Sequence, residues 1–445
     1  MYEELNANQK VNHYPGSFNF GRKDKLWMNL SSLALRMHCL NVVDFHPETF
    51  ILPQEIATLK RQMELNSSLK LILKPPASAR GNGIQIIHKA NQIPKPARVR
   101  RKLPSNKTTL IAQKYIENPL LLFNETKFDI RIYVLVTSFN PLRMYLFDDG
   151  LVRFASVKYS NDLSKLNDQF MHLTNYSINK KSSTYQINED ENSLDGHKWT
   201  FKRFFAYVQE NMPSVQIDLL CDRIVDLLLK TVISCQYSIV GLVEKHLKTK
   251  YNSYELLGFD IMLDSNWKPW LLEVNISPSL RSESSVDTFV KGQLIKDMLN
   301  IVGYRLPISF EDDLLNYELT LEEATKHRCF YAQYDQALKE LKNAFLCAEK
   351  DFGLTEHLTS DDVRHLCFAE DEFTRKGNFK RLFPSRISQD YLKYFQQAQY
   401  YNFLLNEWQR KYADRRLEGI ERLRKLCAEG INVQGAKGKA SSSDL

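Results

Sequence analysis

Two apolar stretches separated by a turn carry one carboxylate each. The stretches GFDIML and WLLEVN are predicted strands on either side of the polar turn DSNWKP. If Leu263 pairs with Trp270, Asp260 lies directly opposite Glu273. Both acidic residues interrupt near-buried apolar strands, which favours a chemical role. The alternative is an exposed strand face that carries polar residues by chance.

A third oxygen donor follows on the second strand. Because side chains alternate along a strand, Asn275 shares a face with Glu273. Together with Asp260, they offer three hard oxygen ligands, too few for a calcium site built from protein alone. The set suits Mg²⁺, which keeps bound waters and takes further ligands from substrate phosphates.

A glycine-containing loop, KPPASARGNG, runs from Lys74 to Gly83. Glycines let backbone N–H groups approach phosphate oxygens, and a lysine supplies a positive charge. The loop lacks the order of a P-loop, and it leads into a strand where a P-loop leads into a helix. A phosphate-binding loop and an ordinary glycine turn both remain open on these residues alone.

Charged residues also mark one face of a third predicted strand. Lys127, Asp129 and Arg131 alternate with apolar residues, and Arg153 lies further along the chain, followed by the motif HLTNYS that begins at His172. Buried charges in a sheet need partners. The functional interpretation is an active-site floor that holds phosphates and a carboxylate. The simpler interpretation is a pair between Asp129 and Arg131, and His172 is expected to be structural.

Predicted strands and helices position these residues. Strands are predicted at 69–74, 84–88, 109–116 and 128–136, and helices at 198–209 and 215–234. The segment RMYLFDDGLVRFAS predicts a hairpin that turns at Asp149–Gly150. Beyond residue 307 the pattern becomes helical, and residues 391–426 predict a long basic helical stretch.

Composition narrows the class of protein. The 445 residues are 43% hydrophobic and 25% charged, which excludes wholesale disorder. We find no apolar run of 18 residues and no secretory signal at the amino terminus. The seven cysteines contain no CxxC pair, which favours reduced thiols in the cytosol. Of the net charge of +7, residues 373–426 hold 13 Lys or Arg against 5 Asp or Glu, which indicates an acidic partner or a solvated face.

Five motifs in one order resemble those of the tubulin tyrosine ligase-like family. The resemblance is nearest to its polyglutamylase branch of the initiating type, which begins new side chains made of glutamate. The five motifs are KPPASARG, KFDIR, HLTNYS, GFDIMLD and LEVNISPS. The resemblance implies an α+β, ATP-grasp fold with mixed and antiparallel sheets, followed by a helical basic extension. It also implies that ATP phosphorylates a glutamate side chain of a protein and that the amine of free glutamate then attacks the acyl phosphate.

The resemblance assigns roles motif by motif. ATP contacts fall to Lys74, Arg80, Gly81, Gln113, Lys114, Tyr115, Ile116, Lys127, Phe128, Asp129, Thr174 and Asn175. The incoming glutamate falls to Arg153, Tyr176, Ser177 and Lys198. Asp260, Glu273 and Asn275 would bind Mg²⁺, with Glu273 also catalytic. Arg131 would stabilise the acyl phosphate.

The same resemblance divides the chain. Residues 1–70 are expected to be a remnant of a truncated N-terminal lobe, and residues 71–120 a central lobe. Residues 121–306 are expected to form a C-terminal lobe with the Mg-ATP and amino-acid site. A helical extension with a basic microtubule-binding segment is expected at 307–430, and a disordered tail at 431–445.

Partners and location follow from the same resemblance. The expected partners are acidic tubulin C-terminal tails and free L-glutamate, with no nucleic acid and no membrane. A monomer in the cytoplasm, on microtubules and at a cilium or basal body, is expected. The alternatives are a non-catalytic microtubule-associated pseudoenzyme, or a ligase that uses glycine, tyrosine or a non-tubulin acidic substrate.

Overall fold

The computed structural model describes residues 9–78, 81–94, 110–247, 251–304 and 353–431, together with residues 2 and 5. Arg80, part of the helical extension and nearly all of the expected tail lie outside the described residues.

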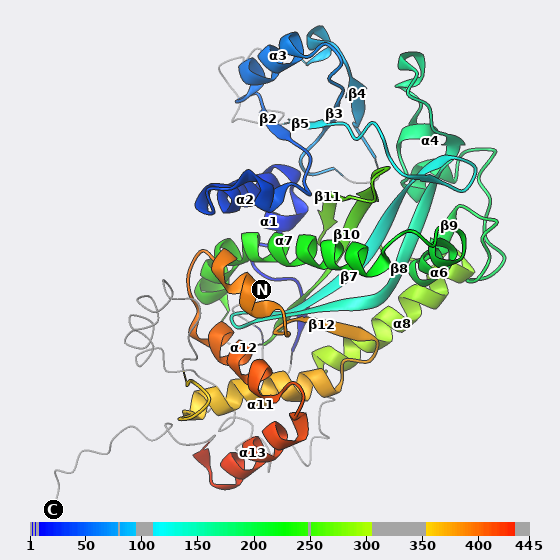
Figure 1. The fold of residues 1–445 in the computed structure, drawn as a ribbon. Coiled ribbons are helices and arrows are strands. Elements are labelled where there is room, and N and C mark those ends of the chain that lie inside the picture. The colour runs from blue at the N-terminus through cyan, green and yellow to red at the C-terminus, as the bar shows by residue number, and fades with distance from the viewer. Residues whose placement is uncertain are drawn as a thin grey trace, which may run out of the picture.

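A large, mostly antiparallel sheet forms the centre of the molecule (Figure 1). Its main path runs β1-β10-β7-β8-β12, with β11 on β10, β6 on β7 and β9 on β8. The bounds are β1 Val11–Asn12, β6 Leu121–Leu122, β7 Thr126–Phe139, β8 Leu142–Lys158, β9 Lys198–Thr200, β10 Ser253–Leu263, β11 Pro269–Asn275 and β12 Phe379–Phe383. Only the β1–β10 pair among them is parallel, so the predicted mixed sheet and the α+β class are confirmed.

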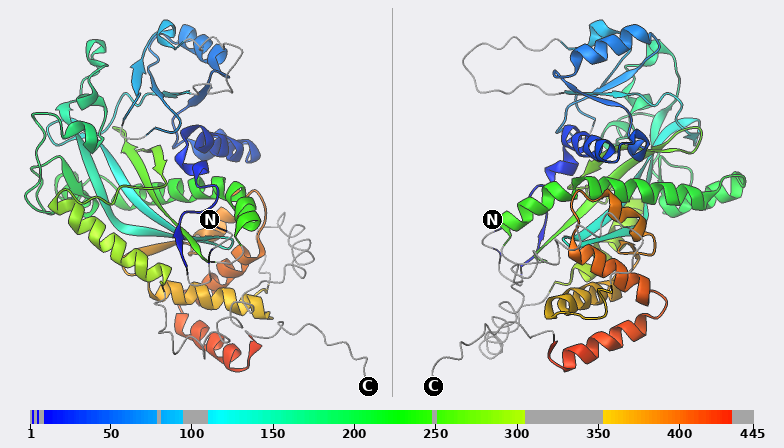
Figure 2. Two further views of the ribbon diagram at one scale, coloured as in Figure 1. Left: turned by 180° about the vertical axis from the view of Figure 1, so that it is seen from behind. Right: turned by 60° about the vertical axis from the view of Figure 1, so that its left-hand side comes forward.

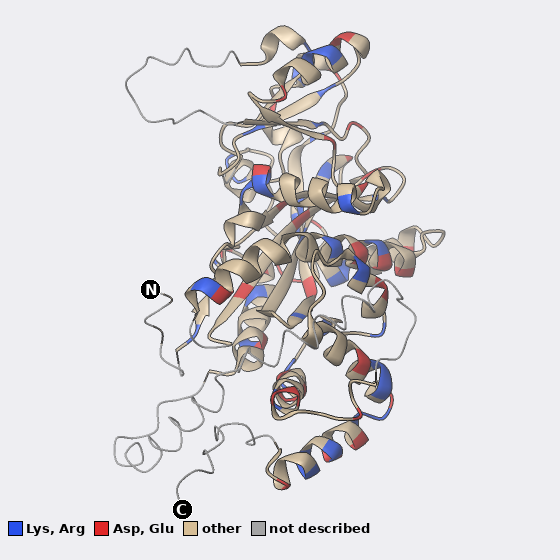
Figure 3. Cartoon of the chain, turned by 90° about the vertical axis from the view of Figure 1, so that its left-hand side faces the viewer, with Lys and Arg blue, Asp and Glu red and all other residues tan. Residues whose placement is uncertain are grey.

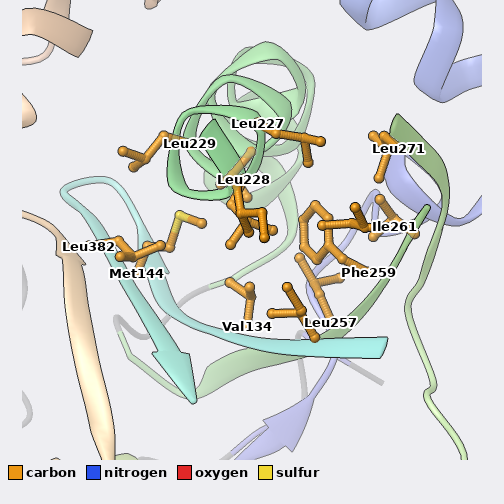
Figure 4. Close-up of a cluster of buried hydrophobic side chains, with 14 of the residues drawn as sticks. Val134, Met144, Leu227, Leu228, Leu229, Leu257, Phe259, Ile261, Leu271 and Leu382 are labelled. Atoms are coloured by element: carbon orange, nitrogen blue, oxygen red, sulfur yellow. The ribbon is translucent and has the colours of Figure 1, made fainter. Parts of the chain in front are cut away.

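Two helices cover opposite faces of this sheet. α7, Ile217–His246, packs Leu227 and Leu228 over the apolar face that carries Val134 and Phe259 (Figure 4). α8, Ser285–Val302, packs on the other face, around Tyr133. The predicted alternation of β7 is therefore confirmed. The charged residues of β7 lie on the same face as Tyr133, and α8 covers the part of that face around Tyr133.

α7 is long and apolar enough to cross a membrane by length and composition alone. However, 72% of its most apolar window is buried inside the protein, as in a core helix.

A smaller four-stranded sheet lies at one end of the molecule, with α3 beside it (Figure 1). Its order is β2-β5-β3-β4, and β3 and β4, which lie within the strands predicted at 69–74 and 84–88, form a hairpin around the glycine loop. The bounds are β2 Thr49–Leu52, α3 Ile56–Leu65, β3 Leu71–Lys74, β4 Gln85–Ile87 and β5 Leu110–Lys114. α2, Lys23–Arg36, contacts both α7 and β5, so it bridges the two sheets.

The predicted hairpin turn at Asp149–Gly150 is wrong. β8 continues through both residues, and the turn lies at Asn140 and Pro141, between β7 and β8. The Asp149 side chain accepts hydrogen bonds from the backbone N–H groups of Gly150 (2.8 Å) and Lys202 (3.1 Å), which satisfies it inside the sheet. A Cβ at Gly150 would lie 2.4 Å from the Arg131 carbonyl oxygen, so glycine is required for strand approach.

The described part of the C-terminal extension lies at the end opposite the small sheet (Figure 2). It holds α11 Ser360–Thr374, η6 Ser388–Tyr394, α12 Tyr400–Tyr412 and α13 Arg416–Ala428. The expected helical character is confirmed, but two separate helices, α12 and α13, replace one long stretch. The sequence did not predict β12, which adds to the large sheet by pairing with β8.

Short helices complete the described chain. They are α1 Phe18–Gly21, η2 Leu40–Val43, η3 Ala90–Gln92, η4 Leu163–Lys165, α4 Gln169–His172, α5 Tyr176–Asn179 and α6 Phe201–Asn211.

Candidate active site

A solvent-open cleft of about 790 Å³ lies between the two sheets. Most of the expected nucleotide and metal residues line it, from β3, β5, β7, β10, β11 and the segment before α5. These are Lys74, Gly81, Gln113, Lys114, Tyr115, Ile116, Lys127, Asp129, Thr174, Asn175, Asp260 and Glu273. Residues spread over 200 positions of sequence are thus brought to one place.

The strand register aligns charges in two rows across the large sheet. Lys198, Arg153 and Asp129 are neighbours across β9, β8 and β7. Arg131, Asp260 and Glu273 are neighbours across β7, β10 and β11. Charges that are distant in sequence therefore lie side by side.

The expected pairing of Asp260 with Glu273 is confirmed, but the register used to reach it is wrong at the turn. Leu263 pairs with Pro269 and Met262 with Trp270, and a register shift follows Asp260. Leu272 has no partner in this register, so the pairing shifts by one residue there and Asp260 lies opposite Glu273 as expected.

Asp260 is held by two arginines. Arg131 donates from Nε at 2.5 Å and from Nη2 at 2.9 Å, and Arg153 Nη2 lies 3.0 Å away. Burial alone would raise the pKa of Asp260, but the two guanidinium groups outweigh burial and lower this pKa. Asp260 therefore stays ionised in the cleft.

Asp129 belongs to the same network, yet the simple Asp129–Arg131 pair is wrong. Its carboxylate accepts hydrogen bonds from Arg153 at 2.7 and 2.6 Å and from Thr174 Oγ1 at 2.7 Å. Burial raises the pKa of Asp129, and Arg153 only partly opposes this rise. Arg153 thus bridges the two carboxylates.

Three buried lysines approach the cleft from separate elements. Lys74 comes from β3, Lys127 from β7 and Lys23 from α2. Burial, with repulsion from Lys23, lowers the pKa of Lys74 to about 8. Burial, with repulsion from Lys74, lowers the pKa of Lys127 to about 7. The cleft therefore holds its buried ammonium groups at a free-energy cost that an anion would relieve.

Lys23 was missed by the sequence analysis. Its ammonium lies 2.9 Å from Glu273 Oε2 and donates to the Ser78 carbonyl oxygen of the glycine loop at 3.0 Å. It lies some 50 residues before the nearest motif, so no local pattern could have assigned it to the cleft. Met262 and Leu272, which also line the cleft, were missed as well, although Met262 follows from alternation with Asp260.

His172 is held in place by its neighbours, as expected of a structural histidine. Its Nδ1 lies 2.8 Å from the Tyr115 hydroxyl, and its Nε2 lies 3.1 Å from the Lys165 carbonyl oxygen. The carbonyl accepts, so Nε2 carries the proton and Tyr115 donates to Nδ1. Lys127 in turn donates to the Tyr115 oxygen at 3.2 Å.

One expected nucleotide residue does not line the cleft, and the structure does not describe another. The assignment of the Phe128 side chain to the ATP site is wrong, because this side chain is 1% exposed and packs against Phe154 and Phe204 on the opposite face of β7. Arg80 lies outside the described residues. Gly81 has a φ of +76°, and a Cβ there would lie 2.5 Å from Ile178 Cδ1, so the loop packs tightly on α5.

The expected amino-acid residues lie beside the cleft. Lys198 Nζ is 2.6 Å from Asp287 Oδ2 and 4.2 Å from the centre of the Tyr176 ring. Ser177 follows on α5 and is partly exposed. Arg153 joins this group to the carboxylates.

The residues expected to bind a divalent cation are neighbours on β10 and β11, with the amide nitrogen of Asn275, rather than its oxygen, towards Asp260. Asn275 Nδ2 lies 3.4 Å from Asp260 Oδ2, and Glu273 is the cross-strand neighbour of Asp260. The described residues hold no group of three or more His, Cys, Asp or Glu side chains that could bind a metal, so the set rests on two carboxylates and an amide. Such hard oxygen donors fit Mg²⁺ shared with phosphates.

Residues 2–314 match the model of the tubulin-tyrosine ligase family. The chain belongs to this family. The expected ATP-grasp fold and the family resemblance are thereby confirmed.

Three relatives cover nearly the whole chain. The human protein named tubulin monoglutamylase TTLL4 is 44% identical over 443 residues, which are 97% of this chain and 36% of the relative. The Caenorhabditis elegans protein named tubulin polyglutamylase ttll-4 is 39% identical over 436 residues, 96% of this chain and 68% of the relative. The mouse protein named tubulin polyglutamylase TTLL5 is 33% identical over 418 residues, 91% of this chain and 30% of the relative. The chain thus spans only about a third of the mammalian relatives.

Proposed function

We propose that this chain is an ATP-dependent ligase that joins glutamate to glutamate side chains in the acidic C-terminal tails of tubulin. The observation that carries the proposal is the cleft between the sheets, where lysines from three elements face two cross-strand carboxylates. The names of the similar glutamylases support the choice of substrate.

The reaction needs a carboxylate to become an electrophile. A γ-phosphoryl group passes from ATP to a side-chain carboxylate oxygen of the acceptor, which forms an acyl phosphate and ADP. The amine of free glutamate attacks the acyl carbon, the C–O bond to phosphate breaks, and the amine loses a proton. An isopeptide bond and inorganic phosphate result.

Positive side chains serve this chemistry by offsetting charge on phosphate oxygens. Lys74 and Lys127 would contact the phosphates of ATP, while Tyr115 and Ile116 would flank the adenine. Arg131 would stabilise the acyl phosphate, because its guanidinium is fixed by Asp260 at the cleft floor. Thr174 and Asn175 would face the nucleotide.

Asp260, Glu273 and Asn275 would hold Mg²⁺. The ion supplies charge neutralisation on the phosphate oxygens. In this structure Lys23 pairs with Glu273. If Glu273 bound Mg²⁺ instead, the Lys23 ammonium would be available to bind an anion such as a phosphate.

The amino-acid site favours a dicarboxylic substrate. Arg153, Tyr176, Ser177 and Lys198 would receive the incoming glutamate. Two cationic side chains in this group suit a donor with an extra carboxylate, which glycine and tyrosine lack. The intact carboxylate pair and its lysines count against a non-catalytic, microtubule-associated role.

A basic segment would hold acidic tubulin tails or the microtubule surface. Lys and Arg stretches mark α13, the lowest helix in Figure 3. Arg424 and Lys425 are exposed there. Arg416 has a structural role instead, because it pairs with Glu370 at 2.5 Å and lies over the Phe373 ring at 3.7 Å.

The proposal extends to the setting of the enzyme. The chain would act as a monomer in the cytoplasm, on microtubules and at a cilium or basal body. The two lobes that clamp ATP would be residues 71–120 and 121–306, with β2 from the preceding segment completing the small sheet.

Mass spectrometry of tubulin tails tests the function. Purified protein is incubated with tubulin, ATP and Mg²⁺, and with glutamate, glycine or tyrosine in separate reactions. The expected result is a mass gain of one glutamate residue in the glutamate reaction and its absence for the Glu273→Ala variant. Gain with glycine or tyrosine instead would overturn the amino-acid assignment, and gain by Glu273→Ala would overturn the metal assignment.

A further inference from the structure

A buried group of three charges lies next to the proposed amino-acid site. Asp287, in the first turn of α8, receives Lys198 Nζ at 2.6 Å and Lys291 Nζ at 2.7 Å, on opposite carboxylate oxygens. The three side chains are 3%, 7% and 7% exposed. None of the catalytic roles above uses Asp287 or Lys291.

Asp287 is itself rigidly placed. Ser284 caps α8, and its hydroxyl accepts from the Asp287 backbone N–H at 3.2 Å and donates to Asp287 Oδ2 at 3.1 Å. A carboxylate in the first turn of a helix is also favoured by the helix dipole. The anchor for Lys198 is therefore fixed to the start of α8 by two hydrogen bonds with Ser284.

Lys198 depends on this anchor. Burial lowers the pKa of Lys198, and Asp287 opposes that effect. The Tyr176 ring covers the ammonium at 4.2 Å, which restrains it further. Because Lys198 is the cross-strand neighbour of Arg153, the anchored ammonium continues the charged row of the cleft floor.

The charge count of the group leaves room for an anion. Two ammonium groups share one carboxylate, so the group keeps one positive charge. Lys291 prevents Asp287 from neutralising Lys198 completely, and Lys291 is held in turn by the Arg281 carbonyl oxygen. A buried excess of one cation is costly unless an anion compensates it.

We propose that Asp287 is a positioning residue of the amino-acid site. Asp287 holds Lys198, and Lys198 and Lys291 together form the subsite for the side-chain carboxylate of a dicarboxylic amino acid. This inference rests on the proposed function and adds its specificity element. Glutamate, with one more carboxylate than a neutral amino acid, compensates the surplus charge.

Asp287→Asn tests the inference against a matched control. Asp297→Asn makes the same change on the same helix, away from the site. The Asp297 carboxylate is buried and accepts hydrogen bonds from the Gln293 side chain and the Asn378 backbone N–H. In steady-state ligation at saturating ATP, Asp287→Asn is expected to raise the KM for glutamate about tenfold to a hundredfold, the range for a charge-assisted contact, because Lys198 loses the partner that positions it and this loss outweighs the added positive charge. The kcat and the affinity for an ATP analogue stay within about twofold, and the control leaves all three unchanged.

A double-variant cycle shows whether Asp287 acts through Lys198. Lys198→Met is expected to raise the KM for glutamate, and the double variant is expected to raise it no further. Asp287→Glu keeps the charge and is expected to give an intermediate KM, which provides a readout if Asp287→Asn does not fold.

The outcomes separate the two proposals. An unchanged KM in Asp287→Asn or Asp287→Glu, with a raised KM in Lys198→Met, overturns this inference and leaves the function standing. Additive effects in the double variant overturn it as well. If the wild type incorporates no glutamate, the proposed function fails and the inference falls with it.

Discussion

Binding of ATP is predicted to draw protons into the cleft. Lys127 and Lys74 have pKa values of about 7 and about 8, because both are buried and repelled by neighbouring lysines. Phosphate oxygens favour the charged form of each lysine. Since the bound state holds more protons than the free state, affinity must fall as pH rises.

The magnitude follows from the two pKa values. At pH 8 the uncharged fraction is about nine tenths for Lys127 and about one half for Lys74, so binding takes up about 1.4 protons. Between pH 7 and pH 9 the affinity is expected to fall about 50-fold through Lys127 and about tenfold through Lys74 if both must be charged.

Isothermal titration calorimetry at pH 8, in two buffers that differ in ionisation enthalpy, measures this uptake directly. Lys127→Met is expected to reduce it to about 0.5 proton, the share of Lys74. Lys202→Met serves as the control, because Lys202 is exposed and pairs with Asp148. Tight ATP binding without proton uptake would refute the reasoning, since it would show that both lysines are already charged before ATP binds.

Three further outcomes are expected. Arg131→Met leaves Asp260 buried with one guanidinium fewer and should lower the free energy of unfolding by about 3 to 5 kcal/mol in urea denaturation; a loss below about 1 kcal/mol would contradict the buried-pair account. Gly150→Ala places a Cβ 2.4 Å from a backbone oxygen and should lower the melting temperature, whereas an unchanged melting temperature would show that β8 relaxes freely. Reversing Arg424 and Lys425 to Glu should weaken cosedimentation with microtubules at low salt while ATP binding is kept, and unchanged cosedimentation would remove α13 from the microtubule surface.

Local pattern fixed much of the site. Alternation in residues 128–136 separated the charged face of β7 from its apolar face, and the motifs around Asp260 and Glu273 predicted that these carboxylates face each other. The period of a strand is determined by neighbouring residues, whereas the Asp260–Glu273 pair also needed the register shift after Asp260. The glycine loop between β3 and β4 is also a local feature.

Partners across distant strands could not be predicted in this way. The sequence allowed Asp129 to pair with Arg131, but the register of β7 against β8 and β10 gave Asp129 to Arg153 and Arg131 to Asp260. Period determines which face a side chain takes, whereas register between strands depends on the packing of the whole sheet.

Long-range contacts decided the remainder. Lys23 reached Glu273 because α2 packs against both α7 and the small sheet, and β12 reached β8 from more than 200 residues away. The sequence by itself determined which chemical groups this protein has and which face of its strand each occupies. Only the tertiary structure decided which charges neutralise one another. Charge pairing depends on contacts between chain segments that are distant in the sequence, and a local residue pattern does not predict such contacts.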